Sequence, residues 1–149
     1  MSEFSQDYLL YLLAQASNAA SSQFHAELAS QGVAVGEWRV LASLHPDLNL
    51  SVGELSKQCL IQPSTLSRTL DRLERDGLLE RNYTREDRRQ VKVRLTVDGN
   101  KLADSLVAQA RVNEERVLNN YNDDEIKHLK ETLQKLIIRS ADPDGEATI

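Results

Sequence analysis

The chain has 149 residues, 40% of them hydrophobic, and a formal net charge of −5 at pH 7. This length fits one domain, and the sequence shows neither an apolar run that could span a bilayer nor a signal segment. A single cysteine excludes an intramolecular disulfide. From these features together we expect one cytoplasmic domain, residues 1–149, with no membrane partner.

The first predicted helix runs from Ser5 to about Ser30, a stretch without glycine or proline. Its main apolar side, expected in the core or in a subunit interface, consists of Leu9, Leu12, Leu13, Ala16, Ala20, Phe24 and Leu28. Tyr8, Tyr11 and Gln15 share a second face that mixes aromatic and hydrogen-bonding groups, as ligand pockets do. The alternative is helix packing with the tyrosine hydroxyls reaching water.

A second helix is predicted from Gly36 to His45, ending before Pro46. Trp38 is expected to be a packing anchor, or else a stacking surface for an aromatic ligand. Arg39, next to it, either binds the carboxylate of such a ligand or forms a surface ion pair.

A short third helix is predicted to begin at about Val52, because Ser51 and Glu54 have the spacing of a capping box. Cys59 lies at its end or in the following turn. We expect a buried, inert thiol there, because a redox sensor needs an accessible thiolate and often a second cysteine.

The fourth helix begins at Pro63, which suits a first helical position, and ends at Gly77. Three leucines on one face, Leu66, Leu70 and Leu73, are predicted to be buried. The opposite face is polar and cationic, as a DNA major groove requires. The side chains expected to reach base edges or nearby phosphates are Gln62, Ser64, Thr65, Ser67 and Arg68, with Arg72 placed for a phosphate. Together with the preceding short helix, this is a helix-turn-helix.

Two predicted strands, 78–83 and 90–95, bracket a polar segment rich in arginine. The second strand alternates Val91, Val93 and Leu95 with polar residues, the period of a half-buried strand. A hairpin with a basic tip directly after the fourth helix, the recognition helix of the helix-turn-helix, makes a winged helix.

The charge is polarised along the chain. Residues 68–94 contain nine basic and six acidic side chains, whereas the rest of the chain contains nine basic and seventeen acidic ones. A locally basic surface can meet phosphates while the acidic remainder faces water. The alternative is that these arginines only decorate a solvated face through pairs such as Asp71 with Arg75.

The region from Leu66 to Gly99 resembles the MarR (multiple antibiotic resistance regulator) family. The residues that carry the resemblance are Asp71-Arg72-Leu73-Glu74, Gly77-Leu78, Arg81, Asp87-Arg88-Arg89, Val93-Arg94-Leu95-Thr96 and Gly99. The resemblance implies a homodimeric winged helix-turn-helix repressor or activator, usually released from DNA by a small ligand or an oxidant. It also implies that Asp87 and one arginine brace the wing, and that Arg88 or Arg89 reaches the minor groove. Gln62 departs from the family, which often has a capping serine there.

Two further helices are predicted after the wing. The first runs from Asp98 to Asn119, with inward residues Leu102, Leu106, Ala110, Val117 and Tyr121. The second begins at the capping-box pair Asn122 and Glu125 and repeats apolar residues as a bundle seam does: Ile126, Leu129, Leu133, Leu136 and Ile137. Because no large element remains to cover this seam, we expect it to pair with the first helix and with a second copy of the chain.

The predicted fold is mainly α with a small β-hairpin wing: a winged helix-turn-helix over 36–96, dimerisation helices over 5–31 and 98–140, and a disordered tail over 141–149. We expect a homodimeric repressor that binds a near-palindromic operator in double-stranded DNA and is relieved by a small aromatic or phenolic ligand. A winged helix that only binds proteins, without ligand control, is the alternative. With no catalytic motif, metal-ligand spacing or phosphate loop, we expect no enzymatic activity, metal or cofactor.

Overall fold

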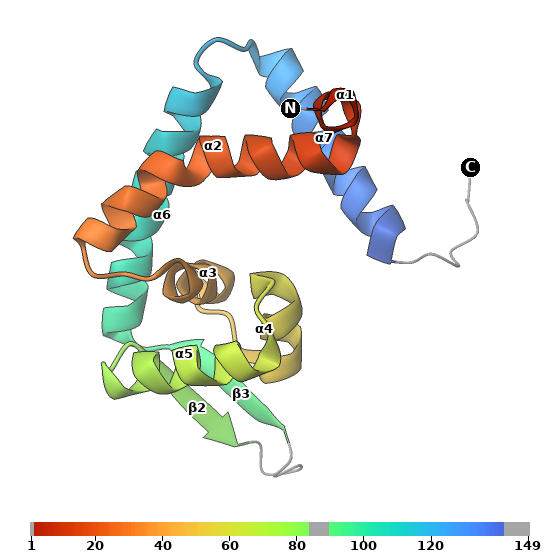
Figure 1. Cartoon of the computed structure of the whole chain (residues 1–149). Helices are drawn as coiled ribbons and strands as arrows, with labels where there is room; N and C mark the ends of the chain where they lie inside the picture. The colour runs from red at the N-terminus through yellow and green to blue at the C-terminus, as the bar shows by residue number, and fades with distance from the viewer. Residues whose placement is uncertain (1, 84–89, 142–149) are drawn as a thin grey trace. The chain divides into compact units, whose positions relative to one another are not determined.

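The computed structural model describes residues 2–83 and 90–141. Its elements are α1 (Glu3–Asp7), α2 (Leu9–Ser30), α3 (Val35–Leu44), β1 (Leu50–Ser51), α4 (Val52–Cys59), α5 (Pro63–Arg75), β2 (Leu79–Tyr83), β3 (Val91–Leu95), α6 (Val97–Leu118) and α7 (Asp123–Ala141). The mainly helical fold with a small β wing is therefore confirmed (Figure 1). Residues 1–113 and 114–149 form two compact units, with the boundary inside α6. None of the described helices is both long and apolar enough to cross a membrane.

The single N-terminal helix predicted from the sequence is wrong in one respect, because it is broken at Tyr8. The backbone there is extended (φ −70°, ψ 116°), which separates α1 from α2. The rings of Phe4 and Tyr8 stack with centroids 4.8 Å apart, and Tyr11 meets both rings edge-on. Helical periodicity cannot show such a break, because no glycine or proline marks it.

The apolar side predicted for α2 reaches the core only near its C-terminal end. Phe24 and Leu28 are buried, whereas Leu9 and Leu12 are 53% and 43% exposed. Gly32 follows the end of the helix with a positive φ of 74°, which favours glycine. One half of α2 thus belongs to the core of the first unit, and the other half is uncovered in a single chain.

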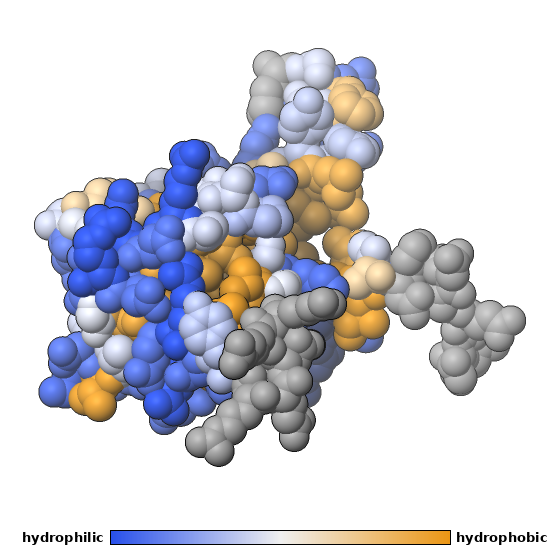
Figure 2. Space-filling view, turned by 90° about the horizontal axis from the view of Figure 1, so that it is seen from below, coloured by the Kyte–Doolittle hydropathy of each residue, from blue (hydrophilic) through white to orange (hydrophobic). Residues whose placement is uncertain are grey.

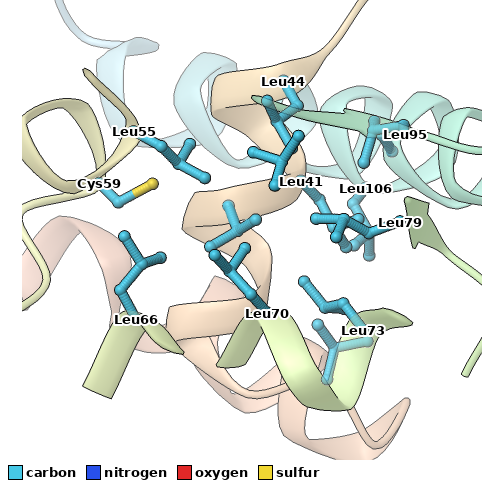
Figure 3. Packing of buried hydrophobic residues seen from close by; sticks show 14 of the residues in the cluster. Leu41, Leu44, Leu55, Cys59, Leu66, Leu70, Leu73, Leu79, Leu95 and Leu106 are labelled. Carbon is cyan, nitrogen blue, oxygen red and sulfur yellow. The ribbon is translucent and has the colours of Figure 1, made fainter. Parts of the chain in front are cut away.

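The core of the first unit is formed by leucines from every element that surrounds α3 (Figure 3). Its largest fully buried side chains are Leu28, Leu41, Leu44, Leu55, Leu66, Leu70, Leu73, Leu79 and Leu106. Trp38 is only partly buried and packs edge-on against Phe24, with centroids 5.2 Å apart. The interpretation of Trp38 as a packing anchor is thus confirmed, because the residue packs against the core.

The sheet contains the predicted hairpin and one strand that the sequence did not reveal. β2 and β3 pair antiparallel from Leu79 opposite Leu95 to Tyr83 opposite Val91. The two-residue β1 adds to β3, with Leu50 opposite Val93, giving the order β1-β3-β2. A two-residue strand is too short to produce an alternating pattern.

The two C-terminal helices occur where they were predicted. Leu106 is buried, with Leu102 and Ala110 packed against the core, but Tyr121 lies beyond α6 and is 57% exposed, so its predicted inward position is wrong. The capping box of α7 is formed, with both Asn122–Glu125 hydrogen bonds at 2.9 Å. No residue of α7 from 123 to 141 is buried. The tail predicted to be disordered lies, from 142 onward, outside the described residues.

Candidate nucleic-acid interface

The helix-turn-helix begins with the capping box predicted from the sequence. The amide of Ser51 donates to Glu54 Oε2 at 2.7 Å, and the amide of Glu54 donates to Ser51 Oγ at 3.2 Å. The turn after α4 passes through Leu60 in the left-handed conformation (φ 54°, ψ 40°), and Ser56 Oγ donates to the carbonyl of Ile61 at 3.0 Å. These local bonds fix the entry of the chain into α5.

The recognition helix α5 has the two faces that its sequence indicates. Leu66, Leu70 and Leu73 are at most 2% exposed and hold the helix against the core. Pro63 is the first helical residue, and Gln62 precedes it without a side-chain cap. The exposed side chains around its N-terminal half and outer face are Gln62, Ser64, Thr65, Ser67, Arg68 and Arg72. Figure 2 shows the molecule from below, where hydrophilic (blue) residues predominate on the described surface and hydrophobic (orange) residues form patches between them.

Arg72 is already engaged within the chain. Its Nη1 donates to Glu37 Oε1 at 3.3 Å, and its side chain remains 61% exposed while that of Glu37 is 10% exposed. The other oxygen of Glu37 accepts the amide of Ala34 at 3.0 Å. The sequence reasoning placed Arg72 but missed Glu37, whose only local signal was its capping position at the start of α3.

Arg81 on β2 ties the wing to the recognition helix. Its Nη1 lies 2.8 Å from Asp71 Oδ1 and 3.3 Å from Glu74 Oε1, both on α5. Asp71 therefore pairs with Arg81 rather than with Arg75, the pair considered from the sequence. The available signal was the spacing of Asp71 and Glu74 on one helical face, together with Arg81 in the family pattern.

The base of the wing is locked to the end of α5. Thr96 Oγ1 donates to the carbonyl of Gly77 at 2.6 Å and accepts the amide of Gly99 at 3.1 Å. The amide of Thr96 donates to the carbonyl of Leu78 at 3.1 Å. A Cβ on Gly99 would lie 1.9 Å from that carbonyl oxygen, so only glycine permits this approach.

Three residues assigned to the wing, Asp87, Arg88 and Arg89, lie outside the described residues. Their assigned roles, bracing the wing and reaching the minor groove, stay predictions. The strands on either side of them, β2 and β3, do form the expected hairpin.

The residues considered for a ligand pocket are not gathered in one place in a single chain. Tyr8 and Tyr11 pack together with ring centroids 5.8 Å apart, beside a depression of about 390 Å³ lined by residues 3, 4 and 7–9. Trp38 instead contacts Phe24, and Arg39 is exposed. Because Phe24 lies thirteen residues after Tyr11 on α2, about 20 Å of helix separates the two groups.

Cys59 is buried, as the sequence suggested, at 2% exposure. Its Sγ lies 3.4 Å from Ser43 Oγ and 3.5 Å from the carbonyl of Arg39. Burial raises the pKa of the Cys59 thiol above its ordinary value, outweighing the opposing effects of Ser43 and Arg39. Within the described parts of the chain, no cluster of three or more His, Cys, Asp or Glu residues could hold a metal ion.

Comparison with known proteins gives consistent results. The family model described as the MarR family matches residues 34–91. The crystal structure of a MarR family transcriptional regulator from Silicibacter pomeroyi is similar, with a TM-score of 0.80 and 40% identity, covering 91% of this chain and 99% of that one. The structure of NadR in complex with 4-hydroxyphenylacetate has a TM-score of 0.76 at 27% identity, covering 83% of this chain and 88% of that one.

Among curated proteins, the HTH-type transcriptional repressor YetL of Bacillus subtilis is 28% identical over 116 residues, which are 74% of this chain and 70% of that protein. The chain spans 62% to 70% of the length of this and two other bacterial regulators that it matches. The winged helix-turn-helix, with 40% identity over almost the whole of a solved regulator, shows that the chain belongs to the MarR family of DNA-binding transcriptional regulators.

Proposed function

We propose that this regulator is a homodimeric repressor that binds a near-palindromic operator in double-stranded DNA and releases it when a small aromatic ligand binds. The observation that carries the DNA-binding part is the division of α5: three leucines anchor it in the core, and its leading polar and cationic residues are left exposed. A helix anchored in this way can enter a major groove without rearrangement.

In this proposal, the two recognition helices of the dimer enter successive major grooves about 34 Å apart. The residues assigned to base edges or nearby phosphates are Gln62, Ser64, Thr65, Ser67 and Arg68. Arg72 is assigned to a phosphate, Asp87 to bracing the wing, and Arg88 or Arg89 to the minor groove, where arginine senses groove width.

Uncovered apolar side chains on two helices support the dimer. On α2, Leu9 and Leu10 are 53% and 57% exposed, and on α7, Leu129 and Ile137 are 49% and 66% exposed. A second copy related by two-fold symmetry would remove such surfaces from water. Sedimentation should therefore give a dimer for the wild type and a smaller species for Ile137→Glu; a wild-type monomer at micromolar concentration would contradict the proposal.

Ligand control rests on the aromatic and polar face of α2 and on NadR, whose structure holds 4-hydroxyphenylacetate. The candidate contacts form two groups that lie apart in a single chain: Tyr8, Tyr11 and Gln15 in one, and Trp38 and Arg39 in the other. A ligand as small as this one contacts one group, unless a second copy of the chain brings the two together. Calorimetry with 4-hydroxyphenylacetate, with and without operator, is the test: a ligand that releases DNA must bind more weakly, by the same factor, when DNA is present. If neither this compound nor any other small aromatic acid binds the protein or releases it from the operator, the ligand part of the proposal is wrong.

DNA binding is tested by fluorescence anisotropy with the intergenic duplex beside the gene and with a scrambled duplex of equal length. Arg68→Ala should weaken operator binding by about 1–3 kcal/mol and relax specificity at one position. Lys127→Ala, which removes an exposed cation from α7, is the control and should change binding little. Binding of neither duplex by the wild type would instead favour a winged helix that contacts only proteins, and equal binding of both would contradict sequence-specific recognition.

A further inference from the structure

One buried carboxylate stands apart from the rest of the charged residues. Glu37 is the only charged side chain that is buried among residues 2–83 and 90–141. Leaving an ionised carboxylate in a core costs several kcal/mol unless hydrogen bonds and an opposite charge compensate it. The position of Glu37 therefore needs an explanation.

Helix capping explains only half of its contacts. Glu37 Oε2 accepts the amide of Ala34 and thereby caps α3. A glutamine could supply the same acceptor, because capping boxes use Glu or Gln. The negative charge is explained only by the second contact, in which Oε1 accepts a hydrogen bond from Arg72 of the recognition helix.

The geometry of this pair leaves Arg72 available for DNA. The Glu37 side chain is 10% exposed and that of Arg72 is 61% exposed. The buried carboxylate therefore contacts the guanidinium from the core side, and most of the Arg72 side chain remains open to solvent. A guanidinium has five N–H donors in a planar fork, and the contact with Glu37 uses Nη1. The remaining donors can reach a phosphate oxygen. Arg72 also lies one helical turn after Arg68 on α5, on the same face.

We propose that Glu37 is a positioning residue for operator recognition: it holds Arg72 in one orientation and offsets its charge, so that Arg72 adds affinity mainly when the duplex is docked in the correct register. This inference rests on the proposed DNA-binding function. Without the carboxylate, Arg72 is a mobile, uncompensated cation that can follow any phosphate backbone. Glu37 then contributes to specificity rather than to raw affinity.

The main test is Glu37→Gln, which keeps an acceptor for the Ala34 amide and removes the ion pair. Affinity for the operator and for a scrambled duplex is measured over a range of salt concentrations. We expect Glu37→Gln to bind the scrambled duplex more tightly than the wild type does. The slope of its affinity against salt concentration should steepen by the equivalent of up to about one phosphate contact. The ratio of operator affinity to scrambled-duplex affinity should fall about fivefold. An unchanged ratio would overturn the proposal.

A double-mutant cycle with Arg72→Gln separates positioning from a general structural effect. If Glu37 acts through Arg72, then Glu37→Gln should leave the affinity ratio unchanged when Arg72 is already replaced. An equal fall in both backgrounds would contradict the proposal. Glu54→Gln is the matched control, since Glu54 caps α4 in the same way and should show no coupling with Arg72.

A second variant keeps the test valid even if Glu37→Gln does not fold. Arg72→Lys alters an exposed side chain and keeps the positive charge but lacks the planar fork. The proposal expects it to retain binding to the scrambled duplex while losing part of the operator preference; a full preference would refute it. If the wild type itself shows no operator preference and Arg68→Ala has no effect, the proposed function fails as well. If those two behave as proposed and only the Glu37 and Arg72 variants do not, the inference alone is wrong.

Discussion

Replacing Gly99 by alanine should be among the most damaging single-methyl changes in this chain. The added Cβ would lie 1.9 Å from the carbonyl oxygen and 2.9 Å from the carbonyl carbon of Leu78. Because both are backbone atoms, α6 or the start of β2 must move by about 1 Å to restore a tolerable contact. That movement strains the bonds by which Thr96 joins Leu78 and Gly77. Overpacking of about 1–3 kcal/mol, with two hydrogen bonds at about 1 kcal/mol each, gives a loss of about 3–5 kcal/mol.

Thermal unfolding at fixed protein concentration measures this loss, because dimerisation would make Tm depend on concentration. For a chain of this length, 1 kcal/mol shifts Tm by about 2–4 °C, so Gly99→Ala should lower it by about 6–20 °C. The matched control is Gly53→Ala in α4, where the nearest atom to the new Cβ is Ser51 Oγ at 3.9 Å. It should be neutral or stabilise by up to about 1 kcal/mol. A Gly99→Ala protein within 1 °C of the wild type would refute this account of the wing base.

Two substitutions and one labelling experiment test other parts of the first unit. Ser51→Ala removes the cap of α4 and should lower the free energy of unfolding in urea by about 1 kcal/mol; no change would mean that water replaces the cap fully. Arg81→Ala breaks the contacts with Asp71 and Glu74 and, since these pairs are partly exposed, should cost at most about 1 kcal/mol while speeding amide exchange in β2. Equal exchange in both proteins would contradict the bracing role. Because burial raises the pKa of Cys59, iodoacetamide should label it slowly at pH 8 and quickly in urea, and stability should fall as the pH rises through the unfolded thiol's pKa; fast labelling of the folded protein would show the thiol to be accessible.

The features that could be predicted from the sequence are those decided by residues close together in the chain. The Ser51–Glu54 and Asn122–Glu125 boxes lie three residues apart, and each formed as predicted. Pro63 and Gly77 bounded the recognition helix correctly, because each sets the backbone at its own position.

The features that were missed depend on residues far apart in the sequence. Glu37 and Arg72 are thirty-five positions apart, and β1 exists only because β3 offers a free edge. At the break at Tyr8, the rings of Phe4 and Tyr8 stack, and the sequence there contains no glycine or proline that would predict a break. The ligand candidates illustrate the same limit: Tyr11 and Trp38 come from two separate helices and were considered for one kind of ligand, although their ring contacts lie far apart along α2.

The ion pairs also explain how a chain of net charge −5 can present a basic surface to DNA. The two acidic residues within α5, Asp71 and Glu74, are both engaged by Arg81 on the wing. The segment 62–70 contains no acidic residue. Arg68 lies within it, in the N-terminal half of α5, where the helix dipole is positive. At physiological salt, exposed charges are screened beyond about 8 Å. The acidic residues elsewhere in the chain therefore reduce the attraction between this segment and a phosphate much less than the net charge would suggest.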